Sequence, residues 1–381
     1  MSLESVKKSD VLIIGAGVIG LSLARELHKK GFGRVTIIEK GSVGREASYA
    51  AAGMLAAQAE GGRADDFFHF CRESAGIYPQ FAEELLDETD VDIELDREGT
   101  LYLAFTEADV EELARRFEWQ TGAGLTVERL SAVETHKLEP FVSPDVLGSL
   151  YFPDDWQVEN RRLLYALEKY CRRFGIEIIE NAGVKALLLE NEKVVGAETA
   201  GGKFFADRVV LATGAWTSLI KAGKLTLPEV KPIRGQIIEY HTAKRLFHKV
   251  IYSPRGYLVP RRNGRILAGA TAADTGFDKT VLKEETGVLR ENALEIAPSL
   301  INLDIHDQWV GLRPLAADAL PVIGAIEEAE NLYVAGGHYR NGILLAPLTA
   351  KVLAEHLAGE NNSPYLDAFG PRRRRLNAAE A

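Results

Sequence analysis

Three glycines near the N-terminus constrain the fold of this 381-residue chain more than any other feature. Gly15, Gly17 and Gly20 follow the apolar run 11–14 and precede a stretch, 21–30, whose apolar residues recur with helical spacing. A second apolar run comes directly after that stretch. Strand, glycine turn, helix and strand in this order make up the β-α-β unit of a dinucleotide-binding fold. The sequence therefore predicts a Rossmann-type domain.

Each glycine of this pattern has a separate expected role. Gly15 permits the tight turn, Gly17 lets the backbone approach a pyrophosphate, and Gly20 lets the helix pack closely on the strand. The N-terminus of the helix offers free N–H groups and partial positive charge to the phosphates. Glu39 ends the second strand, 35–38, where its carboxylate can accept hydrogen bonds from a ribose. An acid at this position disfavours NADP.

Two distant segments favour FAD over NAD. The apolar run 209–212 and the following Thr213-Gly214 fit a strand that returns to the nucleotide domain. A further apolar run, 331–335, leads through Gly336-Gly337 into the apolar-periodic stretch 341–357. The N-terminus of that helix would face the N1–C2 edge of a flavin and stabilise its reduced anion.

The remaining patterns predict a mixed α/β fold with two interleaved domains. Strand-like alternation occurs at 101–105 and again through 233–270. We expect a Rossmann-type FAD-binding domain interleaved with an α+β substrate domain built on a large antiparallel sheet. The expected boundaries are 1–90, 154–227 and 312–370 for the FAD-binding domain, 91–153 and 228–311 for the substrate-binding domain, and 371–381 for a solvated tail.

Charge and cysteine content exclude several classes of protein. The net charge of −10 argues against nucleic-acid binding, and we interpret the basic run Arg372 to Arg375 as part of the solvated tail. Cys71 and Cys171 are too few for a disulfide framework and fit buried residues in a reducing cytoplasm. Residues 1–9 lack the apolar core of a signal peptide, and the apolar runs are too short to cross a membrane.

Four motifs together resemble one family. They are Gly15 to Gly20, Ala50-Ala51-Ala52-Gly53-Met54-Leu55, Gly311-Leu312-Arg313-Pro314 and Gly337-His338-Tyr339-Arg340-Asn341-Gly342-Ile343. In order and spacing, from Asp10 to about Phe369, the chain resembles the glycine oxidases of bacterial thiamine biosynthesis, within the D-amino-acid-oxidase and sarcosine-oxidase superfamily. The first motif is common among flavoproteins, whereas the last two are much more specific.

The resemblance implies an activity and an assembly. Such enzymes bind FAD non-covalently, form homotetramers and oxidise glycine, sarcosine or small D-amino acids to the imine while reducing O2 to hydrogen peroxide. The imine is hydrolysed to glyoxylate and ammonia or used as a thiazole precursor. Sarcosine oxidases tether their flavin to a C-terminal cysteine. Neither Cys71 nor Cys171 lies in that region, so we expect non-covalent FAD.

The resemblance also assigns the substrate site. Arg313 matches the arginine that clamps the substrate carboxylate, a task suited to a guanidinium. Tyr257 matches a tyrosine that bonds the same carboxylate, although tyrosines in strands more often serve packing. Arg340 matches an arginine near the substrate but could instead anchor the flavin, and Met54 is expected to shape the pocket. The expected flavin contacts are Gly15, Gly17, Val18, Ile19, Gly20, Glu39, Lys40, Ser48, Ala51, Ala52, Gly53, Met54, Val184, Ala212, Thr213, Gly214, Trp216, Gly337, His338, Arg340, Asn341, Gly342 and Ile343.

No residue stands out as a general base, and hydride transfer from a neutral amine would need none. His338 is expected to bond the cofactor or the backbone. Two departures from the family pattern, Arg255 for a histidine and Ala272 for a methionine, predict a roomier pocket. We interpret Asp154, Asp155 and Glu159 as helix-capping residues, and expect no metal.

Two alternatives stay open. A D-amino-acid dehydrogenase would pass its electrons to a quinone or a protein instead of O2. A flavin-bearing subunit without catalytic activity is the second, and the presence of both Arg313 and Tyr257 argues against it.

Overall fold

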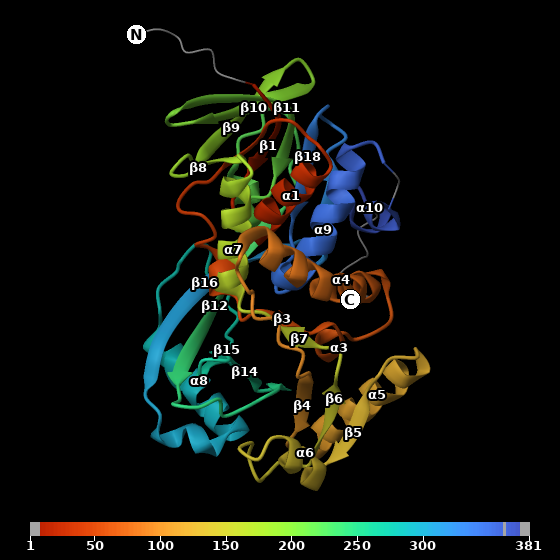
Figure 1. The fold of residues 1–381 in the computed structure, drawn as a ribbon, viewed down its shortest axis with the longest axis vertical. Coiled ribbons are helices and arrows are strands. Elements are labelled where there is room, and N and C mark those ends of the chain that lie inside the picture. Colours follow the sequence, from red (N-terminus) through yellow and green to blue (C-terminus); the bar gives the residue numbers. More distant parts are fainter. Residues whose placement is uncertain (1–7, 361–362, 374–381) are drawn as a thin grey trace.

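Two lobes, each built on one eight-stranded sheet, lie one above the other in the view of Figure 1. A computed structural model describes residues 8–360 and 363–373. The expected fold class, a Rossmann-type unit interleaved with a second unit on a large, mostly antiparallel sheet, is confirmed.

The first sheet is the nucleotide-binding one, and its strands run in the order β17-β18-β11-β1-β2-β8. β1 is central and pairs in parallel with β2 on one side and β11 on the other. β11 extends beyond the sheet into an antiparallel meander with β10 and β9. The strands are β1 (Ser9–Ile14), β2 (Val35–Ile38), β8 (Glu177–Ile179), β9 (Val184–Glu190), β10 (Lys193–Thr199), β11 (Gly202–Leu211), β17 (Val322–Ala325) and β18 (Leu332–Gly336).

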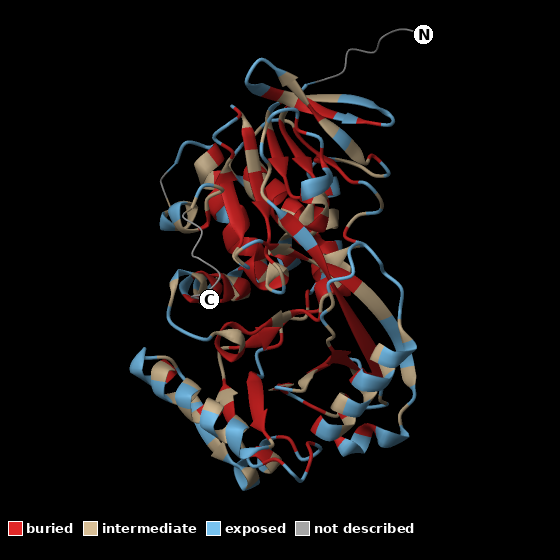
Figure 2. Ribbon diagram, turned by 180° about the vertical axis from the view of Figure 1, so that it is seen from behind, coloured by how far each residue is buried: buried red, intermediate tan, exposed pale blue. Residues whose placement is uncertain are grey.

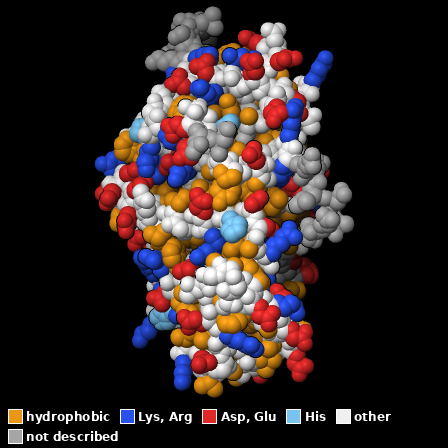
Figure 3. Space-filling view, turned by 90° about the vertical axis from the view of Figure 1, so that its right-hand side faces the viewer, with side chains coloured by type: hydrophobic (Ala, Val, Ile, Leu, Met, Phe, Trp, Pro, Cys, Tyr) orange, Lys and Arg blue, Asp and Glu red, His pale blue; other side chains and the backbone are white. Residues whose placement is uncertain are grey.

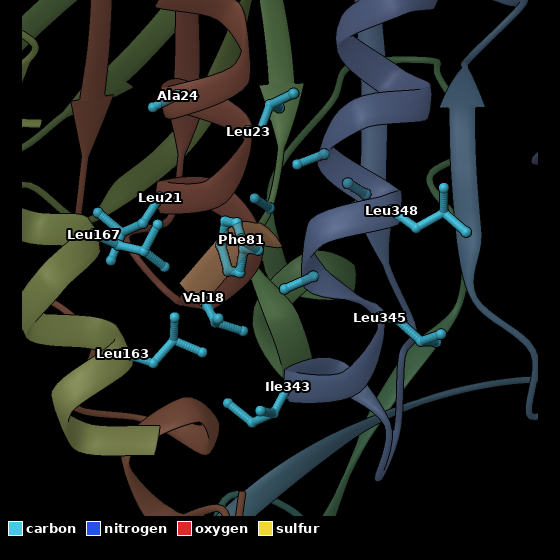
Figure 4. Packing of buried hydrophobic residues seen from close by; sticks show 14 of the residues in the cluster. Val18, Leu21, Leu23, Ala24, Phe81, Leu163, Leu167, Ile343, Leu345 and Leu348 are labelled. Carbon is cyan, nitrogen blue, oxygen red and sulfur yellow. The ribbon is translucent and has the colours of Figure 1, made fainter. Parts of the chain in front are cut away.

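Four helices pack together beside this sheet. They are α1 (Val18–Lys29), α4 (Asp66–Thr89), α7 (Asn160–Arg173) and α9 (Gly342–Leu357). Their apolar faces meet in one buried cluster that includes Leu21, Phe81, Leu163 and Leu345 (Figure 4). Figure 2 shows this lobe as the most continuously buried part of the molecule. The cluster holds the N-termini of α1 and α9 in place near the first sheet.

The second sheet runs in the order β16-β12-β15-β14-β13-β4-β6-β5. Its neighbours are antiparallel except β4 and β13, which pair in parallel. The strands are β4 (Thr100–Ala104), β5 (Glu128–Ser131), β6 (Gly148–Phe152), β12 (Val230–His241), β13 (Val250–Ser253), β14 (Gly256–Pro260), β15 (Arg265–Gly269) and β16 (Ile305–Ala316).

Shorter elements complete the fold. α5 (Glu107–Gly122) and α6 (Ala132–Leu138) contact β4, β5 and β6, and α8 (Lys283–Ile296) contacts β12, β14 and β15. A two-stranded sheet joins β3 (Met54–Leu55) to β7 (Trp156–Gln157). The others are α2 (Ala47–Ala50), α3 (Ala57–Glu60), α10 (Pro364–Phe369) and the 3-10 helices η1 (Gly214–Leu219) and η2 (Pro298–Asn302).

Each sheet is assembled from segments that are far apart in the chain, as interleaved domains require. β16 runs past the expected boundary at 312, because it stays paired with β12 as far as Ala316. We propose the two sheets as the cores of the two domains; their boundaries stay predictions.

The expected solvated tail is wrong at Arg373. Its guanidinium is only 10% exposed, forms an ion pair with Asp318 at 2.6 Å, and donates to the carbonyls of Leu320, Pro321 and Phe369. Arg374 and Arg375 lie outside the described residues. Arg372 is exposed and pairs with Glu327.

The surface and the helices bear on two further expectations. Acidic and basic side chains are interspersed over the face drawn in Figure 3, and nothing in the structure tests the prediction that nucleic acid is not bound. Within residues 8–360 and 363–373, no helix combines the length and apolar character that a membrane span requires.

Candidate flavin and substrate site

A cavity of about 620 Å³ is lined by residues of both sheets. Its walls include the β1–α1 turn, the segment from α2 to α3, the end of β11, and the turn that leads from β18 into α9. β12, β14 and β16 of the second sheet complete it. Every expected site residue lines this cavity except Gly20 and Gly337.

Those two glycines act through the backbone. A Cβ on Gly20 would overlap the carbonyl oxygen of Gly15, so Gly20 allows α1 to lie against the end of β1, as its packing role requires. Gly337 has φ +70°, and a Cβ there would lie 2.9 Å from that of Ala316. Neither glycine lines the cavity, so their place at the cofactor site stays a prediction that rests on these backbone roles.

The β1–α1 turn has the features of a phosphate cradle. Gly15 has φ +112°, and a side chain there would overlap the Ala212 carbonyl. The N-cap of α1 is Gly17, which has no side chain to bond the free N–H groups of the first turn; Ser48 Oγ accepts from the Val18 N–H at 3.0 Å. A helix N-terminus left open in this way is suited to bind an anion.

Glu39 and Lys40 lie at the adjoining part of the cavity wall. The Glu39 carboxylate accepts from the N–H groups of Ala16 at 2.8 Å and Gly41 at 3.0 Å. These bonds fix it at the end of β2, where its remaining lone pairs are available to a ribose. The Lys40 ammonium lies 3.9 Å from the ring centre of Trp216.

Helix α9 presents a second open N-terminus to the cavity. Its N-cap, Asn341, makes no side-chain capping bond, and residues 338 to 343 line the wall. His338 is buried, and its Nε2 lies 3.1 Å from Oγ1 of Thr349. This bond to a side chain was not expected; a bond from His338 to the cofactor stays a prediction, since His338 also lines the cavity. Burial lowers the pKa of His338 to about 3, so its ring is neutral.

Arg313 and Tyr257 come together on the substrate side. Nη1 of Arg313 donates to the Thr271 carbonyl at 2.9 Å, which fixes the guanidinium and leaves other N–H groups free. A Cβ on Gly235 would overlap the same guanidinium. Burial raises the pKa of Tyr257 to about 12, and the nearby charge of Arg313 opposes that rise. Tyr257 is therefore a neutral hydrogen-bond donor.

Arg340 and Met54 also line the cavity, together with a residue that the sequence reasoning missed. Nη2 of Arg340 lies 3.6 Å from Oε2 of Glu60, whose side chain is 12% exposed. Glu60 is the one acidic or basic residue in 47–62, a stretch of otherwise uncharged residues. A lone carboxylate in such a stretch is the signal that could have identified it.

The two departures from the family pattern lie on the cavity wall as well. Arg255 ion-pairs with Glu295 and lies 3.7 Å from Asp109. Ala272 follows Thr271, whose carbonyl holds Arg313. Both positions can therefore influence which substrates fit.

Two of the three acidic residues interpreted as caps, Asp155 and Glu159, bond helix N-termini, whereas the interpretation is wrong for Asp154. Glu159 accepts from the Arg161 N–H at the start of α7, whereas Asp155 caps the distant α3 by accepting from Gln58 and Ala59. Asp154 pairs with Arg72.

Among the described residues, the one group of three with metal-ligand spacing is Glu239, His241 and His306. Bonds from His241 and Arg265 already occupy both oxygens of that glutamate, so we assign no metal there.

The cradle, the two open helix N-termini and the Arg313–Tyr257 pair in one cavity fit the class of flavin-dependent oxidoreductases. Comparisons with known proteins agree. The family model described as "FAD dependent oxidoreductase" (DAO) matches residues 10–356. Glycine oxidase from Pseudomonas aeruginosa is 33% identical over 359 residues, which cover 94% of this chain and 96% of that protein.

Two further relatives extend the comparison. The bifunctional protein ThiO/ThiG from Synechocystis is 34% identical over 371 residues, covering 96% of this chain and 54% of that protein. The crystal structure of glycine oxidase from Geobacillus kaustophilus superposes with a TM-score of 0.92 at 34% identity, covering 96% of this chain and 99% of that one. The chain belongs to the DAO family of FAD-dependent oxidoreductases, and it is an FAD-dependent amino-acid oxidase.

Proposed function

We propose that this enzyme oxidatively deaminates glycine and other small amines, including sarcosine and small D-amino acids. O2 is reduced to H2O2, and the imine is hydrolysed to glyoxylate and ammonia or used to form a thiazole. The observation that carries the proposal is the meeting of Arg313 and Tyr257 in the cavity that the glycine cradle also lines. The glycine oxidase relatives support it.

The protein's contribution is orientation. The free N–H groups of Arg313 bind the substrate carboxylate, and the Tyr257 hydroxyl donates to the same group. A carboxylate held at two points leaves little freedom to the adjoining Cα, so these two residues would orient the substrate. FAD, when bound, would supply the hydride acceptor at its N5. The open N-terminus of α9 stabilises negative charge in its vicinity.

The substrate range follows from two positions in the wall. Ala272 is smaller than the methionine of the family pattern, and Arg255 is held by Glu295 and Asp109. We expect turnover of sarcosine and D-alanine alongside glycine. Turnover of glycine alone, among glycine, sarcosine, D-alanine and D-proline, would contradict a roomier pocket.

One experiment tests cofactor and reaction together. The purified protein should show a flavin spectrum that bleaches on anaerobic addition of glycine and recovers in air with release of H2O2. Bleaching without peroxide would favour a dehydrogenase that uses a quinone or protein acceptor. Bleaching by no amine at all would favour a subunit without catalytic activity.

Other expected properties have partial support. Cys71 and Cys171 are both buried and neither lines the cavity, which supports non-covalent flavin and a reducing, cytoplasmic location. The ThiO/ThiG relatives support a place in thiamine biosynthesis. A homotetramer stays a prediction.

A further inference from the structure

Glu60 is a buried carboxylate in the cavity with an unused oxygen. Its Oε2 is shielded from solvent and accepts no hydrogen bond, although Arg340 lies 3.6 Å away. A buried carboxylate oxygen without a donor is costly to a folded protein, so its retention calls for a reason. The Arg313–Tyr257 clamp leaves Glu60 unused.

The short helix that carries Glu60 is held from three directions. Asp155 accepts from the N–H groups of Gln58 and Ala59, and Gln120 exchanges hydrogen bonds with Gln58. Arg116 donates to the carbonyls of Ala59 and Gly61, on either side of Glu60. This support fixes the backbone of Glu60 more firmly than an exposed four-residue helix would be fixed.

Charge balance suggests what the free oxygen meets. A small amino acid enters as a zwitterion, and Arg313 serves only its carboxylate. The cavity is lined by three carboxylates: Glu39, Glu46 and Glu60. Glu39 is bonded to backbone N–H groups beside the glycine cradle, and Glu46 is paired with Lys40 and Lys279. Glu60 is therefore the acid left to face an ammonium group.

The other titratable groups around Glu60 do not offer an alternative acceptor for a proton of the substrate ammonium group. The charged or titratable groups within electrostatic range are Arg116, Arg313, Arg340, Cys71, Tyr102, Tyr252, Tyr257 and Asp155. Burial raises the pKa values of the three tyrosines and of Cys71, so these groups hold their protons. Asp155 already accepts from two backbone N–H groups.

We propose that Glu60 binds the ammonium group of the substrate and accepts one of its protons, so that the amine is neutral when the Cα hydrogen leaves. One N–H bond of the substrate breaks, one O–H bond forms on Glu60, and the electron pair stays on nitrogen. This inference rests on the proposed amine oxidation and adds to it a proton acceptor and a preference for zwitterionic substrates. Arg340 acts as a positioning residue for the carboxylate of Glu60.

The acid–base strength of Glu60 is suited to this step. Burial raises its pKa above the ordinary value, while Arg340 and Arg313 oppose the rise. A carboxylate with a raised pKa is a stronger base than an exposed one, and a base closer to the working pH is more effective.

The test is Glu60→Gln, followed by anaerobic flavin reduction with glycine between pH 6 and 10. We expect the rate at low substrate to fall on the order of 100-fold at pH 7, the size of a general-base contribution. The loss should shrink as the pH rises toward the amine's own pKa, because the substrate then arrives neutral. Glu60→Asp should recover part of the activity.

A second substrate provides the matched control. N-(2,2,2-trifluoroethyl)glycine has the same carboxylate, but its weakly basic amine is largely neutral at pH 7, so Glu60→Gln should slow it little. Equal losses with both substrates at every pH would show that Glu60 only positions Arg340, and no loss with glycine would also overturn the proposal. If the wild-type flavin is reduced by no amine, the proposed function itself fails.

Discussion

Gly235 and Arg313 depend on each other across the pair of strands β12 and β16. They lie close because Ile233 pairs with Arg313 in the register of these strands, and the guanidinium then lies over the glycine backbone. Any side chain at position 235 would displace the group that we propose binds the substrate carboxylate. Part of the specificity of the site thus comes from a residue without a side chain.

Gly235→Ala should therefore weaken substrate binding without unfolding the protein. The added Cβ would overlap Nη1 of Arg313, and loss of one charge-assisted hydrogen bond costs about 1.5–3 kcal/mol, or roughly 10–100-fold in KM. Steady-state kinetics with glycine measure this. Gly287→Ala is the control, because Gly287 lies in α8 with no atom within 4 Å of the added Cβ. An unchanged KM in the Gly235 variant would refute the dependence.

His338 makes stability depend on pH. Its pKa is lowered from 6.5 to about 3 in the folded protein, so the unfolded chain binds the extra proton between these values. The folded state is fully favoured by this residue above pH 6.5 and loses that advantage as the pH falls toward 3. At pH 5 the loss is about 2 kcal/mol.

His338→Asn should remove that part of the acid sensitivity. Urea unfolding of the FAD-saturated protein at pH 7.5 and pH 5 measures it, with wild type and variant compared at each pH so that other titrating groups cancel. The same loss of stability in both proteins between the two pH values would contradict the assignment.

Among the elements, α3 is only four residues long, yet its position determines where Glu60 lies in the cavity. It is held in place by Asp155, which lies nearly one hundred residues later in the chain and is fully buried. The cap therefore links the loop that carries Glu60 to the segment between β6 and β7.

Asp155→Ala should lower stability by about 1–2 kcal/mol through loss of the cap, and it should also slow flavin reduction by releasing Glu60. Asp65→Ala is the matched control, since Asp65 caps α4 through the Phe68 N–H and does not line the cavity. We expect a similar loss of stability and unchanged kinetics in the control. Thermal unfolding and stopped-flow reduction measure the two effects. An Asp155→Ala variant with wild-type rates of flavin reduction would refute the link between the Asp155 cap and Glu60.

Most elements could be predicted from the sequence because their apolar periodicity matches their burial. β2 has the expected bounds, 35–38, and α9 begins one residue later than the predicted stretch 341–357. β16 spans Ile305–Ala316, which is longer than its apolar residues indicate. Its first residues are exposed, so hydrogen bonds to β12 extend the strand without an apolar signal. β11 spans Gly202–Leu211 and so begins well before the predicted run 209–212, for a similar reason.

Some residues of the candidate site could likewise be predicted from the sequence, and others could not. Glycine motifs identify the cradle because their spacing reflects a backbone requirement. The family resemblance identified Arg313 and Tyr257 as candidate substrate-binding residues. The sequence did not reveal that Asp155 caps α3 or that Gly235 accommodates Arg313, because both depend on contacts between distant segments. Glu60 has no motif at all.

At the scale of the whole molecule, Arg261 joins the second sheet to the loop at Ala52, which lines the cavity. It follows β14 and is 3% exposed, and its guanidinium donates to the side chain of Gln157 and to the carbonyls of Val158 and Ala52. The last contact ties the second sheet to the loop that lines the cavity. A buried guanidinium with this many partners couples the position of β14 to that of the cavity loop.

Arg261→Met should lower stability by about 3–5 kcal/mol, because buried acceptors lose their donor, and it should weaken FAD retention through the Ala52 loop. Thermal release of flavin fluorescence measures both. Arg262→Met is the control: its neighbouring guanidinium is 47% exposed and pairs with Asp92, so about 0–1 kcal/mol is expected. Equal shifts of the flavin-release temperature in the two variants would argue against a link through Arg261.

The central place of β1 in its sheet also determines how long it stays partly unpaired during synthesis. Its partner β11 begins at residue 202, and α9, which packs on α1, begins at residue 342. At roughly 5–20 residues per second, the ribosome delivers β11 about 10–40 s after β1. β1 therefore waits with the backbone N–H and C=O groups of one edge unpaired, and the cavity cannot be completed until α9 has been synthesised. We expect the segment that carries β1 to need protection from pairing with other strands during this interval.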